Sequence, residues 1–133
     1  MRLDPLWRAR SLYYSSKARA KREGIPFNLV RDDIVERVLF GHCEATGAKF
    51  DFRRSKKWHR QPLGPSLDRV NPKKGYTRNN VKVVTWQFNV AKNEYGLEDL
   101  LAMSLALVTR HGLISVTKEV AACGPKKMRK GTK

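Results

Sequence analysis

Acidic residues are scarce in this sequence, and long apolar runs are missing from it. Only 12 Asp and Glu residues stand against 28 Lys and Arg residues, so the chain of 133 residues carries a formal net charge of +16. No apolar run approaches the roughly 20 residues that a membrane-spanning helix needs. The first residues include Asp4, Arg8 and Arg10, so they lack the apolar stretch of a secretory signal. We therefore expect a cytoplasmic protein that does not interact with membranes.

Cysteine is also rare, which argues against a disulfide or a structural zinc site. Cys43 and Cys123 are too far apart for a CxxC knuckle, and a reducing cytoplasm disfavours a disulfide between them. The other candidate zinc ligands lack the short paired spacing that structural zinc sites show, and they are His42, His59 and His111. We expect no structural zinc, and Cys43 is interpreted as a small buried apolar residue.

Excess positive charge is what the sequence has instead. Such a field attracts polyanions, and it gives nucleic acid a salt-dependent affinity that does not depend on base sequence. An anionic membrane would also require an apolar helical face beside the basic one, which the first predicted helix offers only weakly. We expect nucleic acid as the partner and no small-molecule ligand, while a protein partner is left open.

Hydrophobic spacing and turn residues predict an α+β fold, a small helical domain with an embedded ββα finger. Helices are expected at about 5–22, at 32–40, from 87 onward and at 97–110, with terminators at Gly24, Gly41 and Gly112. Strands are expected at 66–70 and 81–86, and a tight turn with extended arms at 43–52. The length predicts one domain, with a basic helical part at 1–42, the ββα finger at 43–95, a helix at 96–115 that packs on the first two helices, and a flexible basic tail at 116–133.

Many of the cations gather where they could contact phosphates. The segment 53–60 is a basic loop around one aromatic residue, Trp58, which suits backbone contact and stacking better than a merely solvated loop. For the first helix and the tail, phosphate contact and a solvated charged surface are equally good interpretations. The residues expected to bind nucleic acid are Arg53, Arg54, Lys56, Lys57, Arg60, Lys73, Lys74, Arg78 and Lys92.

The segment from Pro65 to Lys92 carries the most specific pattern. It begins Pro-Ser-Leu-Asp-Arg-Val-Asn-Pro-Lys-Lys-Gly-Tyr, continues through Asn80 and Val81, and places Asn89 in the predicted helix. It resembles the HNH or His-Me finger (ββα-metal) endonucleases, particularly small phage proteins with Ser-x-Asp-Arg, Lys-Gly-Tyr and Asn-Val followed by a helical Asn. A Cys-x-x-Thr-Gly lead-in at 43–47 and Leu-Glu-Asp-Leu at 97–100 belong to the same match.

The resemblance implies a metal-dependent DNA endonuclease that nicks or cuts phosphodiester bonds, of phage origin and hence in the host cytoplasm. It implies one divalent metal ion held by Asp68 and Asn89, with Asn80 fastening the loop of the finger. Carboxylate and amide oxygens are hard ligands that suit Mg²⁺ first and Mn²⁺ second. Such a metal would act as a Lewis acid on the scissile phosphate. The catalytic set is therefore Asp68, Arg69, Asn80 and Asn89.

Arg69 departs from the family pattern, because that position usually holds the histidine that activates water. A guanidinium stays protonated and cannot act as a base, but it can clamp a phosphate oxygen. His59 is a candidate auxiliary base and Asn71 could orient water, although an uninvolved loop histidine is the better interpretation of His59. Two hypotheses follow: an unusual nuclease, or a catalytically degenerate HNH-fold protein that acts by binding DNA or a DNA-handling host enzyme.

Overall fold

Capping residues fix the ends of the first two helices. In the computed structural model, which describes residues 2–113, α1 spans Pro5–Glu23 and α2 spans Arg31–Phe40. The carboxylate of Asp4 accepts the N–H of Leu6 at the start of α1. Gly24 and Gly41 end the two helices with φ values of 67° and 91°, which favour residues without a Cβ. Both terminators were predicted from the sequence, whereas the predicted tail at 116–133 lies outside the described residues.

A short hairpin and the helix that follows it form the ββα unit. Strand β1 (Pro65–Arg69) pairs antiparallel with β2 (Val81–Thr85), with Leu67 opposite Val83, and α3 spans Trp86–Lys92. The hydroxyl of Thr85 caps α3 by accepting the N–H of Phe88 at 3.2 Å. The predicted α+β fold with a ββα unit is thus confirmed, with strand boundaries shifted by one residue.

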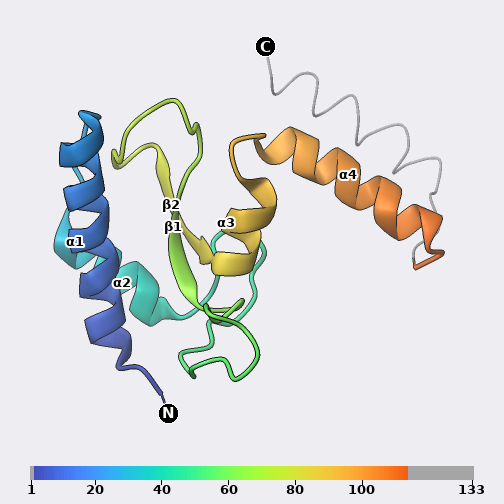
Figure 1. Ribbon diagram of the computed structural model, residues 1–133, viewed down its shortest axis with the longest axis horizontal. Helices are drawn as coiled ribbons and strands as arrows, with labels where there is room; N and C mark the ends of the chain where they lie inside the picture. The colour runs from blue at the N-terminus through green and yellow to red at the C-terminus, as the bar shows by residue number, and fades with distance from the viewer. Residues whose placement is uncertain (1, 114–133) are drawn as a thin grey trace. The chain divides into compact units, whose positions relative to one another are not determined.

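Both faces of the hairpin are covered, which places polar residues of β1 in the interior. Figure 1 shows α1 and α2 on one side of the hairpin and α3 on the other, and contacts between these elements agree with that arrangement. The core combines Ala9 and Leu12 of α1, Ile34 of α2, and Val83 and Val84 of β2. Since neither face is open, the burial along β1 does not alternate, and Asp68 is buried although it is charged.

The loop between the two strands is fastened to the segment that connects α1 and α2. The N–H of Tyr76 donates to the carbonyl of Pro26 at 2.9 Å, and Phe27 and Tyr76 form a parallel bridge. Gly75 is required at this contact, because a Cβ there would collide with the Pro26 carbonyl. The N-terminal helices and the finger therefore form one structure.

The segment before β1 is attached to β2 in the same way. A tight turn through Gly47 is closed by a bridge between His42 and Lys49, as the sequence predicted. Cys43 is buried, as predicted, and its Sγ accepts the N–H of Thr85 at 3.3 Å. This turn therefore rests against the end of the hairpin that precedes α3.

The described chain divides into two compact units, one that ends at Glu94 and one that begins at Tyr95. Helix α4 of the second unit spans Leu97–Arg110, the range that the sequence predicted, and none of its residues is buried. Its packing on the first two helices stays a prediction. Among residues 2–113, no helix is both long enough and apolar enough to cross a bilayer.

Candidate active site

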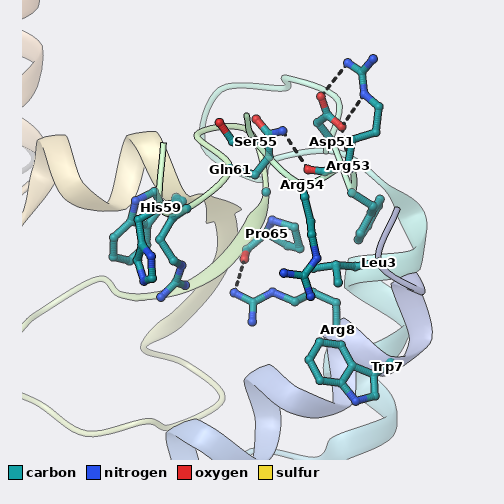
Figure 2. Close-up of a pocket in the computed structure, with 14 residues that line it drawn as sticks. Leu3, Trp7, Arg8, Asp51, Arg53, Arg54, Ser55, His59, Gln61 and Pro65 are labelled. Atoms are coloured by element: carbon teal, nitrogen blue, oxygen red, sulfur yellow. Dashed lines mark hydrogen bonds and ion pairs between the residues drawn. The ribbon is translucent and has the colours of Figure 1, made fainter. Parts of the chain in front are cut away.

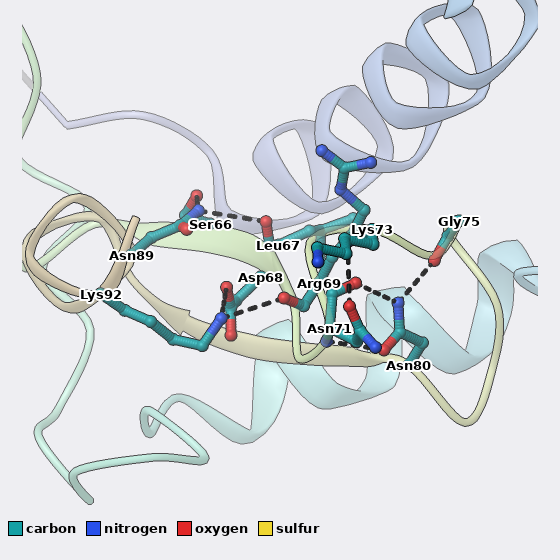
Figure 3. Close-up of polar contacts among 10 residues, drawn as sticks. All are labelled: Ser66, Leu67, Asp68, Arg69, Asn71, Lys73, Gly75, Asn80, Asn89 and Lys92. Atoms are coloured by element: carbon teal, nitrogen blue, oxygen red, sulfur yellow. Dashed lines mark hydrogen bonds and ion pairs between the residues drawn. The ribbon is translucent and has the colours of Figure 1, made fainter. Parts of the chain in front are cut away.

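Asp68 lies in the middle of the site, on β1 and opposite the last turn of α3. Its Oδ1 accepts a hydrogen bond from Nζ of Lys92 at 3.1 Å, and the same ammonium donates to the carbonyl of Arg69 at 3.0 Å (Figure 3). The side chains of Lys92 and Asp68 are only 2% and 5% exposed. Lys92 thus neutralises a carboxylate that the closed hairpin has removed from water.

Burial controls the charge state of this carboxylate. Desolvation raises the pKa of Asp68 above its ordinary value, while the ammonium of Lys92 and the more distant charges of Lys82 and Arg69 oppose that rise. A cation placed beside Asp68 therefore stabilises the ionised form of its carboxylate. In the folded protein, Lys92 supplies that cation.

Asn89 is oriented by its two amide hydrogens. Its Nδ2 donates to Oγ of Ser66 at 2.8 Å and to the carbonyl of Leu67 at 3.1 Å (Figure 3). Because both N–H groups are used on β1, Oδ1 is the atom left to accept a further partner. The helix thereby presents an amide oxygen next to the strand that carries Asp68.

Asn80 holds the loop at the far end of the hairpin closed. Its Nδ2 donates to the carbonyls of Asn71 and Gly75 at 3.1 and 2.9 Å, and its Oδ1 accepts the N–H of Asn71 at 2.9 Å. These are the loop hydrogen bonds that the sequence predicted for Asn80. The side-chain oxygen of Asn71 accepts the N–H of Lys73, so Asn71 is engaged in the loop itself.

One cavity of about 380 Å³ brings the central residues together. It is lined by Asp68, Arg69 and Asn89 of the finger, and also by Arg19 from α1 and Asn93 just after α3. The guanidinium of Arg69 lies 5.2 Å from the centre of the Tyr76 ring and donates to the carbonyl of Lys74. The cavity thus combines the buried carboxylate of Asp68 with two amides and two guanidinium groups, a set suited to a phosphate and a cation, and Glu23 and Glu94 also line it.

The predicted auxiliary residues lie elsewhere. His59 lines a different cavity, near the start of β1, and Asn71 does not line the cavity that holds Asp68. Since β1 runs from one cavity to the other, the structure separates His59 from Asp68 rather than bringing them together.

The cations that were predicted to contact DNA fall into two groups, one buried residue and eight exposed ones. Lys92 stands apart from the others, because it is buried against Asp68, so its charge is used inside the protein and is not presented to a partner. The remaining eight are exposed and flank the hairpin, in the loop before β1 and in the loop between the strands (Figure 1). They are Arg53, Arg54, Lys56, Lys57, Arg60, Lys73, Lys74 and Arg78.

Comparison with known proteins shows which fold this chain shares. No protein-family model and no curated protein sequence matches the chain. A solved structure of the rare-cutting HNH restriction endonuclease PacI does match, with a TM-score of 0.55 over 78% of this chain and 80% of that chain, at 16% sequence identity. The chain has the ββα-metal fold of the HNH endonucleases. The resemblance to HNH endonucleases, which was inferred from the motif containing Asp68, Asn80 and Asn89, is therefore confirmed for the fold.

An HNH fold implies a divalent metal, and the donors of this cavity fit one. Asp68 supplies a carboxylate and Asn89 an amide oxygen, both hard ligands. Within residues 2–113, no group of three His, Cys, Asp or Glu side chains could hold an ion. The set therefore suits Mg²⁺ that keeps most of its waters and takes further ligands from substrate phosphate, rather than a tightly held structural ion.

Three residues at or beside this cavity were missed by sequence reasoning. Lys92 was placed among the surface cations, although its position three residues after Asn89 puts it on the same side of α3. Arg19 was one of many basic residues of the first helix, and Asn93 followed the predicted helix without any signal of its own. Only the packing of α1 and α3 against β1 brings Arg19 and Asn93 into the lining of the cavity that holds Asp68.

Proposed function

We propose that this chain is a metal-dependent DNA endonuclease that hydrolyses phosphodiester bonds in the cavity lined by Asp68, Arg69 and Asn89. The observation that carries the proposal is that a ββα finger of HNH fold gathers a buried carboxylate, a free amide oxygen and a guanidinium in one cavity. The net charge of +16 supports DNA as the substrate. The likeness of the motif to small phage proteins supports a phage origin, and with it the host cytoplasm.

Each residue has a distinct part in the proposed reaction. Asp68 and Asn89 would hold the metal, which supplies Lewis acidity toward the scissile phosphate when bound. Arg69, supported by Tyr76 and the Lys74 carbonyl, would clamp a non-bridging oxygen and stabilise the charge of the transition state. Asn80 keeps the loop, and hence Arg69, in place. Among residues 2–113 no histidine lines this cavity, so we expect slow turnover without an imidazole base.

Plasmid cleavage tests this proposal. Purified protein is incubated with supercoiled plasmid and Mg²⁺, Mn²⁺ or a chelator, and nicked and linear products are measured. We expect cleavage only with metal, and at least a hundredfold loss in Asp68→Asn and in Asn89→Ala. Asp68→Asn is preferred to alanine because its oxygen still accepts the hydrogen bond of Lys92. Wild-type cleavage rates in a folded Asp68→Asn variant would show that the site lies elsewhere.

A second function is favoured by two observations, the presence of Arg69 where a base is expected and the pairing of Asp68 with Lys92. Both fit a binding protein that retains the HNH fold without catalysis. Variants of Arg69 separate the two functions. If Arg69 is a clamp, Arg69→Ala abolishes cleavage and Arg69→Lys restores little, since an ammonium lacks the planar fork. If a base has been lost, Arg69→His creates cleavage in an inert protein. If the wild type, Arg69→Ala, Arg69→Lys and Arg69→His all fail to cleave DNA with every metal tested while DNA binding persists, only the binding function remains.

A further inference from the structure

A second cavity, of about 330 Å³, lies where β1 begins and has no part in the proposed cleavage (Figure 2). Its walls come from the start of α1, from the loop before β1 and from the start of α3. Three arginines and three aromatic rings dominate the lining, namely Arg8, Arg54, Arg60, Trp7, Phe52 and Trp86, while a fourth arginine of the lining, Arg53, is paired with Asp51. Such a combination matches the two chemical parts of a nucleotide, an anion and a flat ring.

The positive charge of this cavity is not neutralised within the described protein. In residues 2–113, no carboxylate forms an ion pair with Arg8, Arg54 or Arg60. The carboxylate of Asp51 does line the cavity, but Arg53 holds it at 2.8 Å on the outer side (Figure 2).

Arg8 is the most constrained of the three arginines. It is half-buried and donates one hydrogen bond, to the carbonyl of Pro65 at 3.4 Å, which leaves most of its five N–H groups unused. Burial and the nearby charge of Arg60 both lower the pKa of Arg8. An anion between these guanidinium groups would relieve their repulsion.

The aromatic residues offer flat surfaces beside those charges. Trp7 is 56% exposed although it lines the cavity, so its indole ring is open to a ligand. The guanidinium of Arg60 lies 4.1 Å from the centre of the Trp86 ring, which fixes a second planar surface. A base can stack on either surface only if it is not paired in a duplex, because a paired base is stacked within its own helix.

This cavity adjoins the proposed active site. Trp86 lines both cavities, and β1 leads from Pro65 in the one to Asp68 in the other. Three residues of strand span roughly 10 Å, a distance that a short stretch of single-stranded DNA backbone can bridge. A single strand held at Arg8 and Trp7 could therefore continue to a phosphate at Asp68.

We propose that the cavity of Arg8, Arg54, Arg60 and Trp7 binds an unpaired nucleotide of DNA, so that the preferred substrate carries a single-stranded segment beside the cleaved bond. The nucleotide site stands on its own geometry, while its position relative to the cut rests on the proposed nuclease function. The base identity is not selected, because stacking accepts any base.

Binding without metal tests the site directly. The full chain is titrated in chelator with a fluorescent oligothymidylate and with a hairpin duplex of equal charge, by anisotropy. We expect Trp7→Ala to weaken binding of the single strand at least about fivefold, the low end for one stacked base, and to change duplex binding less than twofold. Phe40→Ala removes an even more exposed ring on α2, outside the cavity, and should leave both affinities unchanged. A loss of binding in Trp58→Ala, with Trp7→Ala binding like the wild type, would assign stacking to the exposed loop and overturn the proposal.

Charge and ligand controls complete the test. Arg54→Gln should weaken single-strand binding more than Lys49→Gln, which removes one exposed charge away from the cavity. Thymidine monophosphate should compete for the site at lower concentration than inorganic phosphate, and equal competition would overturn the base-binding part. If Trp7→Ala and Phe40→Ala bind the single strand equally well while cleavage still depends on Asp68, the nucleotide site is refuted and the nuclease function is not. If Trp7→Ala alone weakens single-strand binding and no cleavage depends on Asp68, the nuclease function is refuted and the nucleotide site is not.

Discussion

Lys92 gives the buried carboxylate of Asp68 a fixed counter-ion from within the fold. Its ammonium is bonded to Oδ1 of Asp68 and to the carbonyl of Arg69, so it joins the end of α3 to the end of β1. A bound Mg²⁺ would add a second cation beside the same carboxylate. The pair therefore holds Asp68 in position before metal arrives, and it opposes tight metal binding by electrostatic repulsion.

Removal of the ammonium should destabilise the protein strongly. Lys92→Met leaves a buried carboxylate unpaired, which costs about 3–5 kcal/mol in comparable cases, and urea denaturation measures the loss. Lys82→Met is the matched control, because Lys82 lies opposite Asp68 in the hairpin but is exposed. We expect that control to stay within about 0.5 kcal/mol of the wild type.

Two further measurements separate this ion pair from simple packing. The double variant Lys92→Met/Asp68→Asn should regain much of the stability, since neither charge is left alone. Mg²⁺ should raise the stability of Lys92→Met more than that of the wild type, because the metal replaces the missing cation. A loss that persists unchanged in the double variant would mean that Lys92 acts only by filling space.

At the scale of elements, the turn before β1 is joined to α2 and β2 by one glutamate. Glu44 accepts hydrogen bonds from Nε and Nη2 of Arg37 at 2.8 and 2.6 Å, and from the N–H of Val83 at 2.8 Å. Burial raises the pKa of Glu44, but the bonds from Arg37 and Val83 outweigh this and hold the pKa below its ordinary value. The carboxylate thus stabilises the fold only while it is ionised.

This linkage predicts a pH-dependent stability. With its folded pKa below the unfolded value of about 4.3, Glu44 contributes stability above that pH and loses the contribution as the pH falls through the folded pKa. Glu44→Gln should therefore be less stable than the wild type at pH 7, and the difference should shrink below about pH 4. Thermal unfolding across a pH series measures it, with Glu36→Gln on the exposed side of α2 as control. A difference that stays constant with pH would contradict the assignment.

The elements themselves were predictable, because their signals are local. Gly24 and Gly41 end helices, the apolar spacing of residues 97–110 marks α4, and the motif around Asp68 identifies the finger. The contacts of the site were less accessible to sequence reasoning. Lys92 looks like any other basic residue until the hairpin is covered on both faces, and Arg19 lines the cavity of Asp68 only because α1 packs on β1. Burial in three dimensions has no local signature.

At the scale of the molecule, charge should dominate DNA affinity while the site contributes little. The cations flanking the hairpin contact the backbone in this proposal, so the logarithm of the affinity should fall linearly with the logarithm of the salt concentration. Asp68→Asn should bind a random duplex about as tightly as the wild type. Replacement of both Lys56 and Lys57 by glutamine should reduce the slope by ~0.9 for each phosphate that the variant no longer neutralises. An affinity that barely changes with salt would contradict the electrostatic basis of binding.

The bond between Lys92 and Asp68 also has a consequence for synthesis of the chain. The two residues are 24 positions apart, so a ribosome working at about 5–20 residues per second delivers Lys92 roughly one to five seconds after Asp68. Until then, the hairpin has neither α3 to cover it nor an ammonium for its carboxylate. Nascent chains in that interval present the uncovered face of the hairpin to one another. A fragment that stops before Lys92 should therefore aggregate when translated.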